Sequence, residues 1–291
     1  MAGTTVGSRL FDAANYLFLG LVSLSMLLPF VYIIAGSFAD SEQMLSQSMA
    51  FFPSKFSLEG YRYIFSTSTI SWSVIVTVYI TLLGTLINLV LTTLMAYALA
   101  KRQLPGKRIF MLLVLFTMLF NGGMIPTFLV VRSMGLLDTL WSLMIPNAIN
   151  AFNLIVLRSF FQNIPSELEE AAQIDGCSEP GLLPRIIIPL SLPAIATFGL
   201  FYAVNHWNTF FHALMYINDA DKWPIQVWLR QIVIMSSGGV GDSQSMDDGV
   251  VPPAEVIKMA VIVISTVPIL MVYPFLQKHF AKGVMLGSVK G

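Results

Sequence analysis

Charged residues are scarce in this chain of 291 residues, of which they make up 11%. The 16 basic and 16 acidic side chains balance, whereas binding to nucleic-acid phosphates requires a clustered excess of Lys and Arg. The single cysteine, Cys177, excludes an internal disulfide and a metal cage made of cysteines, and the 3 histidines are dispersed. We therefore expect no nucleic-acid partner, no metal site and no catalytic nucleophile.

The sequence also lacks the phosphate-binding loop Gly-x-x-x-x-Gly-Lys-Ser/Thr, which cradles nucleotide phosphates. We therefore expect that the chain is not an enzyme and binds no cofactor of its own. Apolar side chains are abundant instead: 56% of the residues are hydrophobic, against about 45–50% in soluble domains, and the mean hydropathy is +0.75. This composition is typical of an integral membrane protein.

Six apolar segments are long enough to cross a bilayer, whose hydrocarbon core takes about 20 residues of helix. They cover residues of about 14 to 38, 72 to 98, 109 to 131, 140 to 160, 186 to 207 and 256 to 277. The sequence therefore predicts an all-α membrane protein with six transmembrane helices, formed by residues 1–291 as a single domain.

The basic residues of the connections predict the orientation, because cytoplasmic loops are enriched in Lys and Arg. Ten lie on the side of both termini and five on the other, so we expect both termini in the cytoplasm. The ten are Arg9, Lys101, Arg102, Lys107, Arg108, Arg158, Arg185, Lys278, Lys282 and Lys290, and the five are Lys55, Arg62, Arg132, Lys222 and Arg230.

A polar segment of residues about 161–185 separates the fourth and fifth apolar segments, on the expected cytoplasmic side. It contains Glu167, Glu169 and Glu170 and reaches a glycine, Gly176. Acidic side chains suit the first turns of a helix, and glycine can adopt the left-handed conformation that ends one. We expect Ser166 to cap this helix at its start.

A second short helix is expected from about Glu179 to Pro189, so that the segment forms a rigid helix-turn-helix that stands off the bilayer. In a chain this apolar, a surface so rich in carboxylates is most naturally presented to another protein. The segment reads Glu169-Glu170-Ala171-Ala172-Gln173-Ile174-Asp175-Gly176, and Ile186-Ile187-Ile188-Pro189 follows.

This spacing resembles the EAA loop of binding-protein-dependent ABC importer permeases, with Ile188 where the family pattern has Leu. Trp207-Asn208 and the terminal residues 283–291 are similar to the carbohydrate-uptake branch that includes the smaller permease of the maltose importer. Residues 120–126 and 136–146 resemble the branch for oligosaccharides and polysaccharides that includes the alginate importer.

The resemblance implies a transmembrane subunit of an ATP-driven carbohydrate importer, a multi-pass protein of the cell inner (plasma) membrane. It implies four kinds of partner: a second permease subunit, two ATPase subunits that bind ATP and Mg, an external solute-binding protein and a carbohydrate substrate. We expect a heterodimer of permeases, although a homodimer stays open. The residues expected to couple the chain to the ATPase are Glu169, Glu170, Ala171, Ala172, Asp175, Gly176, Ile186 and Pro189.

Polar residues within the apolar segments are candidates for the substrate path, because such groups are costly in lipid and face a bundle interior or a wet cavity. Asn147, Asn150 and Asn153 recur every third residue, which would place them along one face of the fourth helix. Hydrogen bonding between helices is the alternative. Asn205, His206, Trp207 and Asn208 form a second cluster, for which anchoring at the lipid interface is the alternative.

The outer connections, residues about 39–71 and 208–255, contain aromatic side chains that fit either interfacial anchoring or docking of the binding protein. Two other functions stay open, and a third is disfavoured. An ABC permease could carry another solute, such as peptides. A membrane scaffold would need no ATPase. An ion-coupled transporter would need carboxylates within the membrane, and no apolar segment has Asp or Glu near its middle.

Overall fold

The computed structural model describes residues 6–40, 43–44, 52–236 and 255–271. Regular structure within these residues is helical, apart from one isolated antiparallel bridge between Ala39 and Phe56. The chain forms two compact units, residues 1–71 with 229–267 and residues 72–228 with 268–291. The terminal motif 283–291 and much of the outer connection 208–255 lie outside the described residues.

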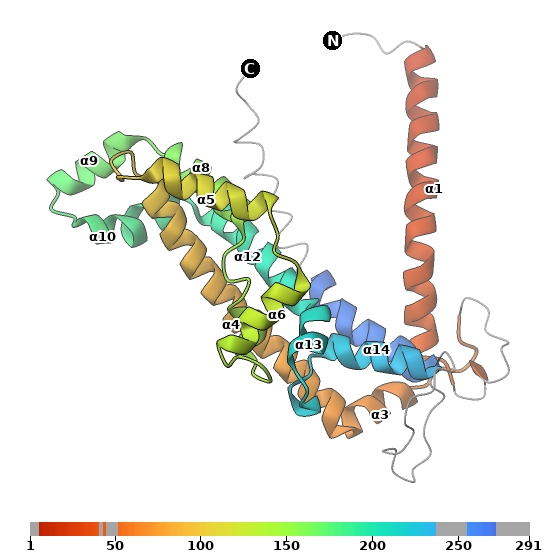
Figure 1. The fold of residues 1–291 in the computed structure, drawn as a ribbon. Helices are drawn as coiled ribbons and strands as arrows, with labels where there is room; N and C mark the ends of the chain where they lie inside the picture. Colours follow the sequence, from red (N-terminus) through yellow and green to blue (C-terminus); the bar gives the residue numbers. More distant parts are fainter. Residues whose placement is uncertain (1–5, 41–42, 45–51, 237–254, 272–291) are drawn as a thin grey trace. The chain divides into compact units, whose positions relative to one another are not determined.

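The first unit contains α1 (Val6–Ser37), α3 (Glu59–Ser66), most of α14 (Ile225–Ser236) and most of a helix over residues 255–271. Residues Leu10–Ser37 of α1 are long and apolar enough to cross a membrane, and none of their most apolar window is buried (Figure 1). The end of α1 is tied to α3, since Ser37 Oγ and Tyr61 Oη lie 2.8 Å apart. The first predicted transmembrane segment is therefore a continuous helix.

The second unit is built around α4 (Ser68–Ala100), whose 33 residues form an uninterrupted apolar helix. The other predicted segments of this unit are broken. The third divides into α5 (Lys107–Leu119) and α6 (Met124–Ser133), which are bent by 118° where Gly123 has a φ of +89°. The fifth bends by 84° at Ser191, where α12 (Leu192–Trp207) begins.

The fourth predicted helix is also interrupted, so the prediction of one helix over residues 140–160 is wrong. The structure has α7 (Trp141–Met144) and α8 (Ala151–Gln162), with turns and bends between them. Pro146 lies in this break, and its ring nitrogen cannot donate a helical hydrogen bond. In the described residues, two helices can cross a membrane by length and composition, or four if each bent pair is one span.

A stripe of polar side chains runs along α4 and is buried inside the unit. The stripe recurs at intervals of four or seven residues, as expected for one face of a helix. Its buried members are Ser73, Thr77, Thr81, Asn88 and Thr92.

Two members of the stripe bind backbone groups, one at the start of a helix and one in a helix break. Thr77 Oγ1 accepts a hydrogen bond of 2.9 Å from the backbone N–H of Ile225, the first residue of α14. Asn88 Nδ2 donates to the backbone carbonyl of Asn147, in the break before α8, at 3.4 Å. Broken helices are tolerated within a membrane when protein groups satisfy the freed backbone in this way.

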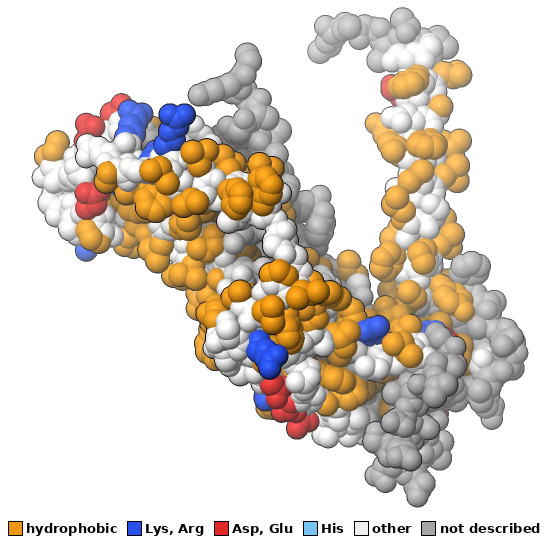
Figure 2. All heavy atoms as spheres, viewed as in Figure 1, with side chains coloured by type: hydrophobic (Ala, Val, Ile, Leu, Met, Phe, Trp, Pro, Cys, Tyr) orange, Lys and Arg blue, Asp and Glu red, His pale blue; other side chains and the backbone are white. Residues whose placement is uncertain are grey.

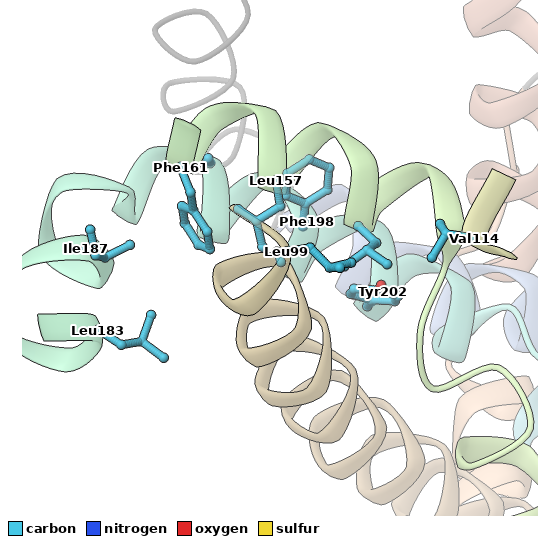
Figure 3. Packing of buried hydrophobic residues seen from close by; sticks show 11 residues of the cluster. Leu99, Val114, Leu157, Phe161, Leu183, Ile187, Phe198 and Tyr202 are labelled. Atoms are coloured by element: carbon cyan, nitrogen blue, oxygen red, sulfur yellow. The ribbon is translucent and has the colours of Figure 1, made fainter. Parts of the chain in front are cut away.

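An apolar cluster joins the end of α4 to α8, α12 and the segment before α12. Figure 3 shows Leu99 of α4 and Leu157 and Phe161 of α8 packed near Leu183 and Ile187. Leu157 is completely buried and Ile187 is 1% exposed. This cluster connects the polar segment of residues 161–185 mechanically to the apolar helices.

We expect Gly84→Ala to destabilise the protein. A Cβ at this position of α4 would lie 2.6 Å from Nε2 of His206, a buried ring on α12. Overpacking of a well-packed site costs about 1–3 kcal/mol, and thermal unfolding in detergent measures it. The control is Gly20→Ala in α1, where an added Cβ meets nothing within 4 Å. Equal unfolding temperatures for the two variants would contradict the close contact between α4 and α12.

Candidate functional site

Residues 166–190 form a hairpin of two short helical arms, which we call the coupling hairpin. The first arm is α9 (Ser166–Ile174), and it ends in a turn closed by two backbone hydrogen bonds. The Cys177 N–H donates to Ala172 O at 2.9 Å, and the Gly176 N–H donates to Gln173 O at 3.0 Å. This pair of bonds is the Schellman motif, which satisfies the last carbonyls of a helix.

Gly176 occupies the left-handed position of this turn, with a φ of +84°. The prediction that it ends the helix is confirmed. The predicted cap at the other end is wrong, because α9 begins at Ser166 itself, and Pro165 at the N-cap position provides no capping side chain.

The second arm returns through α10 (Glu179–Leu182), the π-helical segment η1 (Leu183–Ile187) and α11 (Ile188–Leu190). The π-type bond runs from the Ile188 N–H to Leu183 O. Of the residues singled out from the sequence, Ile186 is half-buried and Pro189 is exposed. The buried residues of this arm are Leu182, Leu183 and Ile187, which the sequence pattern did not distinguish.

The first arm has no buried residue, and its side chains differ in what they face. Glu170 and Ala171 are exposed, as are Asp175 and Gly176 in the turn, while Glu169 and Ala172 are half-buried. Sequence reasoning missed the apolar part of this surface: Ile174 is 86% exposed and Leu168 is 44% exposed. The otherwise polar first arm therefore presents two exposed apolar side chains.

Glu169 forms an ion pair with another residue of the chain. Its Oε2 lies 2.6 Å from Nζ of Lys101, the residue that follows α4. The same ammonium lies 3.2 Å from Glu179 Oε1 of α10 and 4.7 Å from the centre of the Tyr97 ring. Burial disfavours the charged lysine, but the hydrogen bonds with Glu169, Tyr97 and Glu179 outweigh it and raise the pKa of Lys101. The lysine is therefore charged throughout the physiological range.

A cleft of about 890 Å³ lies between α9, the loop of residues 101–105 and the end of α8. Charged side chains gather at this end of the unit, over α9 and α10 (Figure 2). Glu170 and Gln173 contribute to the wall of the cleft. Among the described residues, no group of three or more His, Cys, Asp and Glu side chains is arranged to hold a metal ion.

The polar residues predicted to line a substrate path do not share one helix face, because the break before α8 separates them. Asn147 and Asn150 lie in irregular chain and are exposed, whereas Asn153 is buried in the first turn of α8. Asn150 Oδ1 accepts a 3.1 Å hydrogen bond from the Asn153 N–H and thereby caps α8. In the other cluster, Trp207 is buried, while Asn205 and Asn208 are exposed.

The structure brings the break before α8 beside α12 through two buried side chains: Tyr202, which the sequence did not single out, and His206 of the second cluster. Tyr202 Oη accepts from the Asn150 N–H at 3.2 Å and lies 2.8 Å from Thr92 Oγ1. His206 Nε2 lies 3.4 Å from Asn88 Oδ1. The polar periodicity of α4 was the signal that could have identified this knot, which joins α4, α12 and the break.

A second knot fixes two loops to each other, residues 134–140 and 217–223. Asp138 has a φ of +58°, and its Oδ1 accepts backbone N–H groups of Asn218 and Asp219 at 3.1 and 3.0 Å. Lys222 Nζ lies 3.1 Å from Asp219 Oδ2 and 3.6 Å from Asp138 Oδ2. The hydrogen bond from the Asp219 N–H is the main reason why the pKa of Asp138 lies below its usual value.

A family model described as "Binding-protein-dependent transport system inner membrane component" matches residues 1–286. The chain belongs to this family. It is therefore a membrane component of a binding-protein-dependent transport system, and the resemblance carried by the coupling hairpin is confirmed.

Individual relatives and solved structures agree with this family. The chain is 58% identical to the polygalacturonan/rhamnogalacturonan transport system permease protein YtcP of Bacillus subtilis (strain 168), over 98% of this chain and 99% of YtcP. It is 56% identical to protein LplC of the same organism, over 99% and 97% of the two chains. It also matches a chain in the crystal structure of a bacterial ABC transporter involved in the import of the acidic polysaccharide alginate. That match has a TM-score of 0.89 and 33% identity and covers 96% of this chain and 100% of the other.

We expect Asn88→Leu to destabilise the permease fold, because it removes the hydrogen bonds to His206 and to the Asn147 carbonyl. Side-chain hydrogen bonds within membranes contribute about 0.6 kcal/mol on average and up to about 1.7. The free energy of unfolding in detergent, measured by denaturant titration, should fall by about that range.

The matched control is Asn205→Leu, an exposed asparagine on α12. It should change the unfolding free energy by less than about 0.5 kcal/mol. If Asn88→Leu were as stable as this control, the knot would not hold α4, α12 and the break together.

Proposed function

We propose that this chain is the transmembrane permease subunit of an ATP-driven importer for an oligosaccharide or polysaccharide. In this proposal an external binding protein delivers the sugar, and a second permease subunit completes the path. Two separate ATPase subunits bind ATP and Mg and hydrolyse the nucleotide, since the chain has no phosphate-binding loop.

The observation that carries the ATPase contact is the exposed apolar tip of the coupling hairpin. Ile174 is 86% exposed, and Glu170 and Ala171 on the same helix are also exposed. Burying a large aliphatic side chain contributes about 1.5–3 kcal/mol, so its exposure on an otherwise polar arm favours a protein partner. The Schellman turn closes the end of α9, and the buried residues Leu183 and Ile187 anchor the second arm.

We propose six membrane crossings with both termini and the coupling hairpin in the cytoplasm, in the cell inner membrane. Two of these crossings are α1 and α4, one is the bent pair α5 with α6, and one is α12, which follows the coupling hairpin after the bend at Ser191. The break between α7 and α8, together with α8, provides another, and the helix over residues 255–271 provides the sixth. The excess of Lys and Arg in the loops on the hairpin side supports this orientation.

The relatives support a carbohydrate substrate and favour an acidic one. YtcP is a permease for polygalacturonan and rhamnogalacturonan, and the matching crystal structure belongs to an importer of alginate. We therefore propose oligosaccharides that contain uronic acids as the substrate class. The exposed amides of Asn147, Asn150, Asn205 and Asn208 can donate to and accept from sugar hydroxyls, and we retain them as candidates for the path.

The chain's own part in the cycle is to convert movement of the hairpin into movement of helices. ATP-driven closure of the ATPase pair would push the hairpin, and the apolar cluster of Leu183, Ile187 and Phe161 would carry this displacement to α4, α8 and α12. The loaded binding protein can shift such an equilibrium only if it prefers one state, so it must favour the form that precedes opening to the outside.

Purification in detergent from the native host should recover a second permease and an ATPase with this chain. Ile174→Ser and Glu170→Ala together should abolish recovery of the ATPase, because they remove the apolar and acidic contacts of the tip. Recovery is measured by mass spectrometry. The control is Glu167→Gln, another exposed carboxylate of α9. Recovery of the folded chain alone from wild type would instead favour a membrane scaffold.

We expect Gly176→Val to uncouple ATP hydrolysis from transport while the chain still folds. An added Cβ meets nothing within 4 Å, so the substitution acts through the backbone, whose φ of +84° costs a residue with a Cβ about 1–2 kcal/mol. Gly176→Asn is the control, since asparagine tolerates this conformation better. The ratio of ATP hydrolysed to sugar transported in proteoliposomes measures coupling, and an unchanged ratio for Gly176→Val would refute the role of the turn.

Deletion of the gene should abolish uptake of radiolabelled oligogalacturonate by the native host, and the plasmid-borne chain should restore it. Uptake of neutral maltodextrins and of dipeptides in the same strains separates the proposed substrate class from the alternatives. Loss of dipeptide uptake alone would make the chain a peptide permease.

A further inference from the structure

The first arm of the coupling hairpin, α9, is held to the apolar helices by little besides its ends. It buries none of its residues, and a cleft of about 890 Å³ separates it from the loop that follows α4. Among the described residues, one side-chain ion pair connects α9 to α4: Glu169 with Lys101, at 2.6 Å. If α9 rotated about its ends, a displacement of the hairpin by the ATPase would not reach the apolar helices.

The ammonium group of Lys101 contacts three other side chains, those of Tyr97, Glu169 and Glu179. Lys101 follows directly after α4, and its ammonium packs over the Tyr97 ring, one turn earlier in that helix. It also binds Glu179 at the start of α10, so it reaches both arms of the hairpin. The side chains of Lys101 and Glu169 are only 23% and 26% exposed, which shields the pair from screening by water and salt.

From this geometry we infer that Lys101 is a positioning residue that locks both arms of the coupling hairpin to the end of α4. Glu169 then serves this internal lock, whereas its neighbour Glu170, which is exposed, is left for the ATPase. The inference rests on the proposed function and deepens it: it makes α4, the long helix with the buried polar stripe, the element that receives the movement. It also divides the two adjacent glutamates of the motif between two different tasks.

The lock is tested first in the purified permease, by pulsed electron paramagnetic resonance between two spin labels. In a Cys177→Ser chain, labels are placed at Glu167→Cys on α9 and Leu94→Cys on α4, both exposed positions. We expect one narrow distance distribution that broadens on Lys101→Ala and on Glu169→Gln and stays narrow on Lys101→Arg. An unchanged distribution in both disrupting variants would overturn the inference, and this measurement needs no ATPase and no sugar.

The consequence for transport is tested in the complete transporter in proteoliposomes, with oligogalacturonate as the probe. Lys101→Ala and Glu169→Gln should each lower sugar transported per ATP by at least about fivefold, the lower end of typical coupling between sites. The Lys101→Ala/Glu169→Gln pair should be no worse than Lys101→Ala alone, because the lysine change already removes the contact with Glu169. Lys101→Arg should restore most of the ratio.

Two control variants remove charges of the same kind nearby: Arg108→Ala, an exposed cation in the first turn of α5, and Glu167→Gln on α9. Both should keep the native ratio of sugar to ATP, while all variants recover equal amounts of ATPase. A native ratio in Lys101→Ala and in Glu169→Gln would overturn the lock. Failure of the wild-type chain to recover any ATPase would instead overturn the proposed function, and the label distances would still decide the lock.

Discussion

The constraint on which this structure depends is that backbone polar groups need partners wherever the helices of a membrane protein are broken. Three of the predicted transmembrane segments are interrupted, and α4 is the continuous helix beside them. In its polar stripe, Thr77 accepts a hydrogen bond from the start of α14, and Asn88 donates one to the break before α8. Thr92 is linked to the same break by a hydrogen bond with Tyr202, which in turn accepts from the Asn150 N–H. Contacts with α4 therefore stabilise these sites, and a displacement of α4 would move them together.

In the coupling hairpin, outside the apolar region, the backbone groups at a helix end also have partners. Its turn satisfies the last carbonyls of α9 by the Schellman bonds, and its second arm is anchored by Leu183 and Ile187 in the cluster around Leu157. The stripe within α4, the cluster at its end and the ion pair of Lys101 thus form one continuous series of contacts from the hairpin to the broken helices. We regard α4 as the element through which the proposed cycle operates.

Much of the family and of the hairpin was predictable from the sequence, because local chemistry determines both. Gly176 is required by a left-handed turn, and the spacing to Pro189 identified the permease family. The helix breaks were not predicted, because hydropathy averaged over the length of a membrane span merges the few polar residues of a break, such as 121–123 and 146–150, with the apolar residues around them. The prediction that Asn147, Asn150 and Asn153 share one helix face was wrong for this reason. Pro146 and the cap formed by Asn150 interrupt the continuous helix that this prediction required. The role of Lys101 depends on residues 68 and 78 positions apart in the chain, which spacing alone does not bring together.

The most direct test of the central claim, that the tip of the coupling hairpin contacts an ATPase, is crosslinking in intact membranes. A photoreactive amino acid is placed at Ile174, and the crosslinked product is identified by mass spectrometry. The account predicts a crosslink to an ATPase subunit that strengthens when nucleotide closes the ATPase pair. A crosslink only to lipid, or only to the external binding protein, would contradict both the placement of the hairpin and its role.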